Sequence, residues 1–497
     1  MPFKDHREFM RALKKTGDLV EIDREVDWDC EVGAIGRRNY EKGGPCLHFT
    51  NIKDYPGGYT ILNGSTGTWR RVAICLGLEP QTPVRDIYRH YEERLKVPIE
   101  PVTVGREAAP CKENVQMGDE VDLYTFPAPM IHDGDGGRYI GTWDLVVTST
   151  PDGTWQNWGM YRFMIHNRRW LAGWPQTTSQ LAMKLRQYYM PRNQAMPVAV
   201  VIGADPNSHL AATAPFRPGE SEALYAGGLN GAPIELVRCE TSDLLVPANA
   251  EIVIEGEVPL DQTAPDGPFG EYPGYRSGTM AEGLALRVKA ITYRNDPILT
   301  MIALGVPIDD SSIAASLTAG VAMKRGLLRR KIPITDVYVP PDGVTHLIVV
   351  GVRERGAETA RRILEYFTAR RVMVSKIIVV EEDVDPFNMG QVLHAFASKC
   401  HPGRGIHVEH YEGRANSLSP FYGPAERAVL KGASVAFDCT WPADWDPEII
   451  PVRASFQDMY PQEIKDRVIK NWNDYGLKES REASDAKTGP YLERSQP

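Results

Sequence analysis

Two carboxylates lie five residues apart in a segment that is rich in glycine and proline. The segment spans residues 263–271, reads TAPDGPFGE, and carries Asp266 and Glu271 beside an aromatic ring. Its glycine and proline residues exclude a helix, and acids on a stiff loop next to an aromatic ring are typical of sites that transfer protons. The alternative interpretation is a surface turn between strands, with Asp266-Gly267 as a hairpin signal and Glu271 in solvent.

A cation for these acids is available upstream in the chain. Residues 157–162 read NWGMYR, and the stretch from Tyr161 to Ile165 is strand-like. An arginine on a strand that faces a cavity can hold a carboxylate with two parallel hydrogen bonds; the alternative is a surface salt bridge. Asn157 can bind a cation or a phosphate oxygen, or be only a turn residue. Glu222 begins a candidate helix, where it can be a functional acid or merely complement the helix dipole.

The composition is that of an ordinary globular enzyme. The chain has 497 residues, 42% of them hydrophobic and 24% charged, which is enough for roughly two to four domains with full cores. Its net charge of −9 argues against binding to nucleic acid or to an anionic membrane surface. No apolar run reaches the roughly 20 residues of a membrane span, and the N-terminus lacks an apolar signal region. Seven cysteines without a Cys-x-x-Cys pair favour a cytoplasmic protein with reduced thiols, without a zinc site or disulfide framework.

Several common enzyme motifs are absent. No Gly-x-Gly-x-x-Gly links a strand to a helix, and no phosphate-binding Gly-x-x-x-x-Gly-Lys-Ser/Thr occurs. His-Glu-x-x-His and Gly-x-Ser-x-Gly are missing as well. These absences argue against an ordinary NAD-dependent enzyme, a nucleotide triphosphatase, a zinc protease and an α/β-hydrolase.

The elements that must position these residues indicate a mixed α/β fold. Short β runs broken by glycine and proline dominate from residue 120 to 300, and helical spacing interrupts them at 180–189 and 220–229. After a helix at 311–330, strands and helices alternate (strand 346–352, helix 358–371, strand 372–380, helix 390–397), which is typical of a separate α/β domain. The expected parts are residues 1–120 (an N-terminal α/β segment), 121–310 (β-rich), 311–335 (a linker helix), 336–462 (α/β) and 463–497 (a helix and tail). In the last part, an amphipathic helix is expected to dock on another subunit and residues 479–497 to be partly disordered.

In their order and spacing, these segments resemble the UbiD family of decarboxylases. The resemblance covers residues 5–475 and is densest between 125 and 275. It rests on the segment around Asn157 and Arg162, on Glu222 and on the segment 265–271. Further matching runs are DGDGGRY at 133–139, ELVRC at 235–239, VPA at 246–248 and VDP at 384–386.

The resemblance implies a reversible, non-oxidative decarboxylase that uses prenylated FMN, a flavin whose added ring forms an azomethine ylide. It implies that 121–310 is a split β-barrel that binds this flavin, and that 336–462 is an oligomerisation domain. The implied cofactor-binding residues are Asn157, Gly159, Met160, Tyr161, Arg162, Gln176, Glu222 and Lys376.

The resemblance also implies two metal ions. A divalent ion, commonly Mn²⁺, would tie the cofactor phosphate to Asn157 and Glu222, and hard cations suit such oxygen ligands. A K⁺ ion would be held largely by backbone carbonyls, at Trp155, Ala211, Ala212 and Ala214. Many members place a histidine after the arginine as a third ligand of the divalent ion, yet no histidine occurs between His166 and His209. Gln176, Thr177, Gln180 or water are the alternatives at that position.

The family's catalytic Glu-Arg-Glu network falls on Asp266, Arg162 and Glu271. The first acid is an aspartate here, one methylene shorter, so its contact with Arg162 is expected to need a shifted backbone. In the implied mechanism, Arg162 holds the substrate carboxylate, Asp266 stays ionised and positions Arg162, and Glu271 donates a proton after CO₂ has left. An apolar pocket would favour the acid form of Glu271.

The expected substrate is an aromatic or heteroaromatic carboxylic acid, preferred over an α,β-unsaturated one of the cinnamate type. A flavin prenyltransferase would supply the cofactor, and the chain is expected to form a homodimer or homohexamer. Two other functions stay open: an FMN-dependent reductase built on the β-rich domain, and a non-catalytic subunit of a multi-component carboxylase. The set of Asp266, Arg162 and Glu271 argues against both.

Overall fold

The computed structural model describes residues 3–176, 179–277, 281–370 and 373–477, which form two compact units. The first unit comprises the chain up to Ala322 with the short segments Pro341–Thr345 and Leu418–Gly423. The second unit comprises Met323–Pro340, His346–Ser417 and the chain from Pro424 onward. The division falls within helix α8 (Asp310–Arg329).

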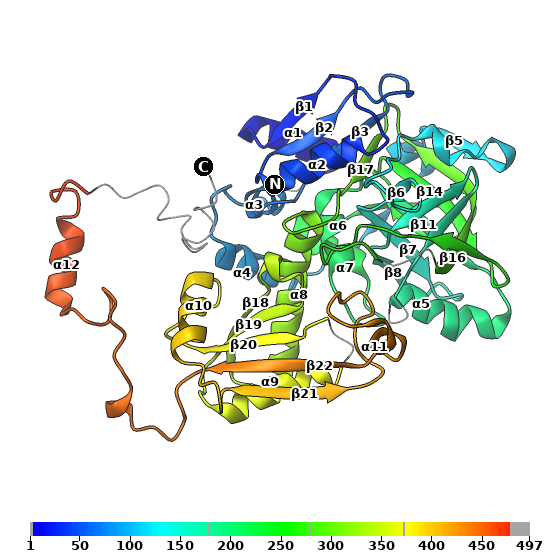
Figure 1. Ribbon diagram of the computed structural model, residues 1–497. Coiled ribbons are helices and arrows are strands. Elements are labelled where there is room, and N and C mark those ends of the chain that lie inside the picture. The colour runs from blue at the N-terminus through cyan, green and yellow to red at the C-terminus, as the bar shows by residue number, and fades with distance from the viewer. Residues whose placement is uncertain (1–2, 177–178, 278–280, 371–372, 478–497) are drawn as a thin grey trace. The chain divides into compact units, whose positions relative to one another are not determined.

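The largest sheet of the first unit is antiparallel, and the candidate acid Asp266 ends one of its strands (Figure 1). Its strands run in the order β6-β9-β10-β16-β14-β11-β7-β8, and β5 and β15 also pair with β16. The strands are β5 (Asn114–Met117), β6 (Tyr139–Gly141), β7 (Asp144–Ser149), β8 (Gln156–Gly159), β9 (Phe163–Asn167), β10 (Trp170–Gly173), β11 (Met196–Ile202), β14 (Ile252–Val258), β15 (Thr263–Asp266) and β16 (Ala281–Tyr293).

Strand β11, an inner strand of this sheet, is apolar along its whole length and almost entirely buried. In β11, Val200 lies opposite Ile254 of β14 on one side and Val146 of β7 on the other. All three side chains are fully buried. The β-branched residues suit the pleated backbone, and their packing fixes the register that places β8 at the end of the sheet.

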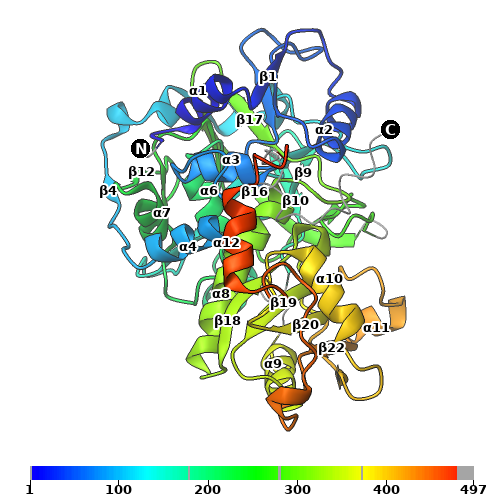
Figure 2. The ribbon, with the colours of Figure 1, turned by 90° about the vertical axis from the view of Figure 1, so that its left-hand side faces the viewer.

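The first unit contains further sheets and the helices that connect them. One sheet has the order β1-β2-β3-β17 and another the order β13-β12-β4. These strands are β1 (Leu19–Ile22), β2 (Cys46–Phe49), β3 (Thr60–Asn63), β4 (Val102–Thr103), β12 (Glu235–Arg238), β13 (Leu245–Pro247) and β17 (Ile298–Met301). The helices are α1 (His6–Thr16), α2 (Glu31–Glu41), α3 (Trp69–Cys75), α4 (Val84–Arg94), α5 (Gln180–Lys184), α6 (Pro206–Thr213) and α7 (Glu222–Asn230). Helices α6 and α7 lie side by side (Figures 1 and 2).

The second unit is built on a sheet of the order β18-β19-β20-β22-β21. Strands β19, β20 and β22 are parallel, and β18 and β21 run antiparallel at the edges. Helix α9 covers one face, because its apolar residues Ile363 and Phe367 recur at helical spacing and are fully buried in the core of this unit. The elements are β18 (Ile334–Tyr338), β19 (Leu347–Val352), β20 (Lys376–Glu381), β21 (Ile406–Tyr411), β22 (Gly432–Cys439), α9 (Ala357–Thr368), α10 (Met389–Ser398), α11 (Pro424–Ala428) and α12 (Gln462–Lys470).

The mixed α/β fold and the alternation after residue 310 are confirmed, but several boundaries differ from those expected. Helix α9 ends at Thr368 rather than at 371, and β20 begins at Lys376 rather than at 372, where its ladder with β19 begins. The helix expected at 180–189 is α5 only as far as Lys184, and then becomes a π-helix over Leu185–Tyr189. Residues 479–497 lie outside the described residues. Within those residues, no helix is both long and apolar enough to cross a membrane.

Candidate active site

Arg162 lies between the two carboxylates that the sequence singles out. Its Nη2 atom is 2.9 Å from Oδ2 of Asp266, and its Nε atom is 3.0 Å from Oε1 of Glu271. The exposed fraction of the side chain is 13% for Arg162, 0% for Asp266 and 8% for Glu271. Ion pairs removed from water to this extent are screened little and hold their geometry. The surface-turn and surface-salt-bridge interpretations of these residues are therefore wrong.

The backbone around this trio differs from the irregular loop that the sequence indicates. Asp266 is the last residue of β15 and lies opposite Ala281 of β16, so it belongs to the sheet. Arg162 directly precedes β9 instead of lying within a strand. Glu271 follows in a turn, where its amide donates to the carbonyl of Tyr275 at 3.1 Å. Asp266 thus reaches Arg162 from a regular strand, despite its shorter side chain.

Tyr139 and Phe269 complete the surroundings of Arg162. Nη1 of Arg162 donates to the hydroxyl of Tyr139 at 3.1 Å, and this hydroxyl in turn donates to Oδ1 of Asp266 at 3.5 Å. The Phe269 ring lies 5.1 Å from the guanidinium carbon and 4.1 Å from the Tyr139 ring. Both rings are fully buried. They exclude water from one side of the cation and fix its plane.

The segment 133–139 holds the loop of the acids in place, a role that sequence reasoning missed although it singled out this segment. Gly136 donates to the carbonyl of Pro268 at 2.7 Å, and a Cβ atom on Gly136 would meet the Gly267 carbonyl oxygen at 2.1 Å. Only glycine permits this approach. Oδ1 of buried Asp135 accepts from the Gly270 amide at 3.1 Å. The motif therefore shapes the loop that carries Glu271.

Burial governs the proton affinities of the two acids. It raises the pKa of Glu271 to about 7; Arg162 lowers this pKa, and the neighbouring Asp266 and Asp135 carboxylates raise it further. Burial also raises the pKa of Asp266, against the lowering effects of Arg162 and the Tyr139 hydroxyl. Glu271 can therefore take up and release a proton near neutral pH, as a general acid must.

Asn157 and Glu222 form a second buried cluster. Asn157 in β8 lies opposite Thr148 in β7, and its Oδ1 accepts from the Thr148 hydroxyl at 2.8 Å. Glu222, the first residue of α7, accepts the Trp158 amide at 2.7 Å through Oε2. Both side chains are at least 98% buried. Sequence reasoning assigned both to cofactor and metal, and the first unit brings them together around the same strand.

A lysine that sequence reasoning missed completes this cluster. Lys184 is fully buried, and its ammonium group donates to Oδ1 of Asn157 and to the Thr148 carbonyl, the latter at 3.1 Å. Burial lowers the pKa of Lys184 to about 7, and the nearby Glu222 carboxylate raises it. Burial raises the pKa of Glu222 to about 8, opposed by the Trp158 amide and by Lys184. The helical spacing of residues 180–189 gave no signal that Lys184 is buried beside Asn157.

This cluster does not fit a divalent metal ion as it stands. Oδ1 of Asn157 already accepts from an ammonium and a hydroxyl group. Among the described residues, no group of three or more His, Cys, Asp and Glu side chains could hold a metal. A divalent ion needs several oxygen ligands freed from such donors. The Lys184 ammonium already occupies the position at Asn157 that a divalent ion would take.

The other implied site residues divide into three groups. The backbone carbonyls of Trp155, Ala211 and Ala214 each accept one amide, at 3.0, 3.0 and 2.9 Å. The Trp155 carbonyl also accepts from the Ser149 hydroxyl at 3.4 Å, so a second lone pair for a cation is offered by Ala211 and Ala214. Gln176 caps the turn before α5 through its carbonyl, 2.9 Å from the Ser179 amide, and Thr177 lies outside the described residues. Lys376 belongs to the second unit, where Nζ donates to Oγ of Ser375 at 3.3 Å. It is therefore not among the residues that the first unit brings together.

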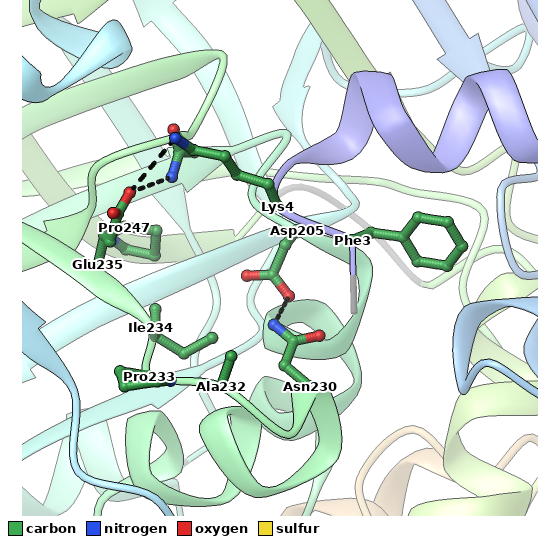
Figure 3. A pocket seen from close by; sticks show the side chains of 10 residues that line it. Phe3, Lys4, Asp205, Asn230, Ala232, Pro233, Ile234, Glu235 and Pro247 are labelled. Atoms are coloured by element: carbon green, nitrogen blue, oxygen red, sulfur yellow. Dashed lines mark hydrogen bonds and ion pairs between the residues drawn. The ribbon is translucent and has the colours of Figure 1, made fainter. Parts of the chain in front are cut away.

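A separate pocket of the first unit contains none of these residues (Figure 3). It has a volume of about 210 Å³ and is lined by acids from two elements, Asp205 and Glu235. Asp205 caps α6 by accepting the Ser208 amide at 3.0 Å and accepts from Nδ2 of Asn230 at 3.0 Å. The role of Asp205 is thus to hold α6 beside α7.

The family models of the 3-octaprenyl-4-hydroxybenzoate carboxy-lyase match the chain in three consecutive parts. The N-terminal domain matches residues 10–90, the Rift-related domain 102–307, and the C-terminal domain 315–439. The Rift-related match contains every candidate site residue of the first unit.

Curated relatives and solved structures agree with these matches over nearly the whole chain. The pyrrole-2-carboxylic acid decarboxylase of Pseudomonas aeruginosa is 34% identical over 95% of this chain and 98% of its own length. Ferulic acid decarboxylase 1 of Saccharomyces cerevisiae is 29% identical over 96% and 99%.

Two solved structures have the same fold. The vanillic acid decarboxylase of Sedimentibacter hydroxybenzoicus in closed form has a TM-score of 0.85 at 27% identity, covering 95% of this chain and 99% of its own. A UbiD-class enzyme of Pelotomaculum thermopropionicum, solved with FMN, has a TM-score of 0.79 at 25% identity, covering 91% and 97%. Three family models in order, and a relative above 30% identity along almost the full length, make this chain a member of the UbiD family of carboxy-lyases.

Proposed function

We propose that this carboxy-lyase decarboxylates an aromatic or heteroaromatic acid, reversibly and without net oxidation, with prenylated FMN as its cofactor. One observation carries the proposal: a buried arginine, Arg162, is flanked within 3.0 Å by Asp266 and Glu271. Of these two acids, Glu271 has its pKa raised to about 7. The names of the relatives, which act on pyrrole-2-carboxylic, ferulic and vanillic acids, support the substrate class.

Arg162 binds the substrate carboxylate and orients the bond that breaks. Its Nη2 and Nε atoms face the two acids, which leaves the guanidinium plane fixed for a bidentate partner. Asp266, tied to the Tyr139 hydroxyl, keeps this orientation. Because the Phe269 and Tyr139 rings exclude water from one side of Arg162, a carboxylate bound to this arginine would be poorly hydrated, which favours losing its charge as CO₂.

Glu271 supplies the proton that replaces CO₂ on the substrate carbon. Its pKa of about 7 leaves a substantial neutral fraction at neutral pH, so that Oε1 or Oε2 can carry a proton to the carbanionic carbon. The carboxylate that results is stabilised by Arg162 at 3.0 Å. Prenylated FMN, when bound, supplies the electrophilic centre that accepts the electron pair released on decarboxylation.

The cofactor fits the first unit through its anionic end. The flavin would lie along the backbone of Gly159, Met160, Tyr161 and Arg162, with Gln176, Asn157 and Glu222 beside it. The ammonium of Lys184 next to Asn157 supplies the positive charge that a phosphate requires.

Potassium and assembly complete the proposal. K⁺ would be held by the backbone carbonyls of Trp155, Ala211, Ala212 and Ala214. A flavin prenyltransferase would supply the cofactor in the cytoplasm. Homodimers or homohexamers would form through the C-terminal part, where Ile469 and Trp472 have exposed fractions of 61% and 39%.

The test is to co-express the chain with a flavin prenyltransferase and to follow CO₂ release and H/D exchange across a panel of aromatic, heteroaromatic and cinnamate-type acids. Turnover of at least one acid, abolished by Glu271→Gln, is the expected result. The matched control is Glu282→Gln, since Glu282 is an exposed acid on β16 outside the trio. A plain oxidised FMN spectrum without exchange on any acid would contradict the proposal and favour a flavin reductase. Activity only after a second protein is added would favour a subunit of a larger carboxylase.

A further inference from the structure

Lys184 stands at an unusual place in the backbone. It is the last residue of α5 and is followed directly by the π-helix Leu185–Tyr189. A π-helical turn is rare and occurs frequently at functional sites, because it re-aims side chains at some cost in hydrogen bonding. Here the change of helix type coincides with a lysine whose side chain is fully buried.

The ammonium group of Lys184 has a complete set of oxygen acceptors. It donates to Oδ1 of Asn157, to the Thr148 carbonyl at 3.1 Å and to the Thr148 hydroxyl at 3.4 Å. The Trp155 ring centroid lies 4.0 Å from Nζ. Three N–H donors therefore meet three oxygens and a ring face, which satisfies every hydrogen-bond donor of an ammonium group.

The contrast with Lys112 shows what is special about this lysine. Lys112 is equally buried in the same unit, but its Nζ forms an ion pair with Oε1 of Glu255 at 2.9 Å. Lys184 forms no direct ion pair among the described residues: its ammonium donates to the neutral oxygens of Asn157 and Thr148, and the Glu222 carboxylate acts on it without a direct contact. A buried cation whose direct partners are neutral is expensive unless an anion neutralises it. Glu222 supplies a negative charge nearby but not in direct contact, so an anionic ligand would be the first charged group to contact this ammonium.

The same oxygens are those that a hard cation would select. Amide, carbonyl and hydroxyl oxygens are ligands of Mg²⁺ and Mn²⁺, and Asn157 is the residue that family resemblance assigns to a divalent ion. A metal bonded to Oδ1 of Asn157 would have to displace the Lys184 ammonium from the same atom, and the two cations would repel. Only one of them can occupy this position.

We propose that Lys184 is a tethered cation that takes the place of a divalent metal ion beside Asn157, so that this chain binds the phosphate of its flavin without a divalent metal. The inference rests on the flavin-binding part of the proposed function. Lys184 supplies one fixed positive charge, held by Asn157, Thr148 and Trp155. Flavin affinity then depends on the lysine and not on the supply of metal.

The first experiment uses the unchanged protein. Purified chain is treated with EDTA, its Mn, Mg, Fe and Zn contents are measured by mass spectrometry, and FMN is titrated with and without added Mn²⁺, following quenching of flavin fluorescence. We expect far less than one divalent ion per chain and the same FMN dissociation constant in both buffers. One divalent ion per chain together with loss of FMN binding in EDTA would overturn the proposal.

The second experiment distinguishes the effect of the charge of Lys184 from the effect of the space that its side chain fills. Lys184→Met fills the same space without charge, whereas Lys184→Ala opens space next to Oδ1 of Asn157. Both variants should bind FMN about tenfold to a hundredfold more weakly in EDTA, the effect expected for losing a hydrogen-bonded charge. Added Mn²⁺ should restore binding to Lys184→Ala but not to Lys184→Met. Lys112→Met is the matched control, and its FMN affinity should not respond to Mn²⁺. Equal responses of all three variants to Mn²⁺ would contradict the tethered-cation role.

The outcomes distinguish this inference from the proposed function. Decarboxylation that requires added Mn²⁺ in the unchanged protein would leave the function intact and refute the role of Lys184. Metal-independent FMN binding without turnover of any acid would support the tethered-cation role of Lys184 and refute the proposed decarboxylation. Circular dichroism of each variant at the assay temperature shows whether it is folded. If the unchanged protein binds FMN in neither buffer, both the proposed function and the role of Lys184 are contradicted.

Discussion

Nη2 of Arg162 lies 2.9 Å from Oδ2 of Asp266, although aspartate is one methylene shorter than the glutamate that the family resemblance leads one to expect. The regular pairing of β15 with β16 brings Asp266 close enough. No irregularity interrupts the register of Thr263–Asp266 along β16. The position of Asp266 on β15 therefore compensates for its shorter side chain, and the contact with Arg162 is formed.

Asp266→Glu should disturb the site even though it restores the commoner acid. The side chain of Asp266 has no exposure, so an added methylene overpacks it and costs about 1–3 kcal/mol of stability. We expect a lower melting temperature and a lower kcat/KM. Thermal unfolding and steady-state kinetics measure the two effects, with Asp266→Asn as the isosteric control. An Asp266→Glu variant with unchanged stability and higher activity would show that the pocket has spare room.

Glu271→Gln should abolish turnover while leaving the cofactor bound. Removing the general acid is expected to lower kcat by about 10²–10⁴-fold, whereas the amide keeps the volume of the side chain. The flavin spectrum of the purified variant tests retention of the cofactor, and CO₂ release tests turnover. Full activity would remove Glu271 from the role of proton donor.

The activity should fall as the pH rises through about 7. The pKa of Glu271 is raised to about 7, so the neutral acid predominates below that pH and the carboxylate above it. Asp135 contributes to this raised pKa, and Asp135→Asn should shift the falling limb of the pH profile to lower pH. The profile of kcat against pH, measured for both proteins, is the test. A falling limb that stays in place in Asp135→Asn would mean that another group controls it.

The same shift makes the folded protein less stable with rising pH between 4.5 and about 7. The ordinary pKa of this carboxyl group is 4.5 and the folded value is about 7, so between the two the folded state holds a proton that the unfolded state has released. The contribution of Glu271 to stability is fully present below 4.5 and is lost by about 7. The test is to measure the melting temperatures of the unchanged protein and of Glu271→Gln across this pH range. The part of their difference that comes from the charge of Glu271 should shrink as the pH falls towards 4.5. A difference between them that does not vary with pH would contradict the shift.

Gly136→Ala should destabilise the protein and displace the acids. A Cβ atom at Gly136 would lie 2.1 Å from the carbonyl oxygen of Gly267, directly after Asp266. Backbone must move, at a cost of about 1–3 kcal/mol or more. Gly57→Ala is the matched control, since nothing lies within 4 Å of its added Cβ. Its effect should stay within about 0.5 kcal/mol. Unfolding in urea measures both variants.

Sequence reasoning found the parts of this protein that depend on pattern and missed those that depend on tertiary contact. Valine-rich β11 and amphipathic α9 follow from periodicity, and Arg162 with its two acids follows from residue type and spacing. The position of Asp266 in a strand does not follow from the sequence, because the glycine and proline residues after it favour a loop over the whole segment 263–271. Lys184 was also missed, since a lysine at helical spacing looks like a solvated residue until β7 and β8 are seen to cover it. Tyr139 belongs to the motif at 133–139, yet the contacts of its hydroxyl with Arg162 and Asp266 are visible only in the structure.

Asp266 and Glu271 are held in the fold in different ways, and the rates of amide hydrogen exchange should differ between the segments that carry them. Asp266 belongs to the β15–β16 ladder, whereas the Glu271 amide is held by the Tyr275 carbonyl within a turn. Ladder amides exchange only when the sheet opens, and turn amides exchange through small local openings. Arg162 and Asp266 can therefore keep their alignment while Glu271 swings away and returns. The acid with the raised pKa therefore lies on the part of the site that opens locally, whereas the acid that orients Arg162 opens only with the sheet.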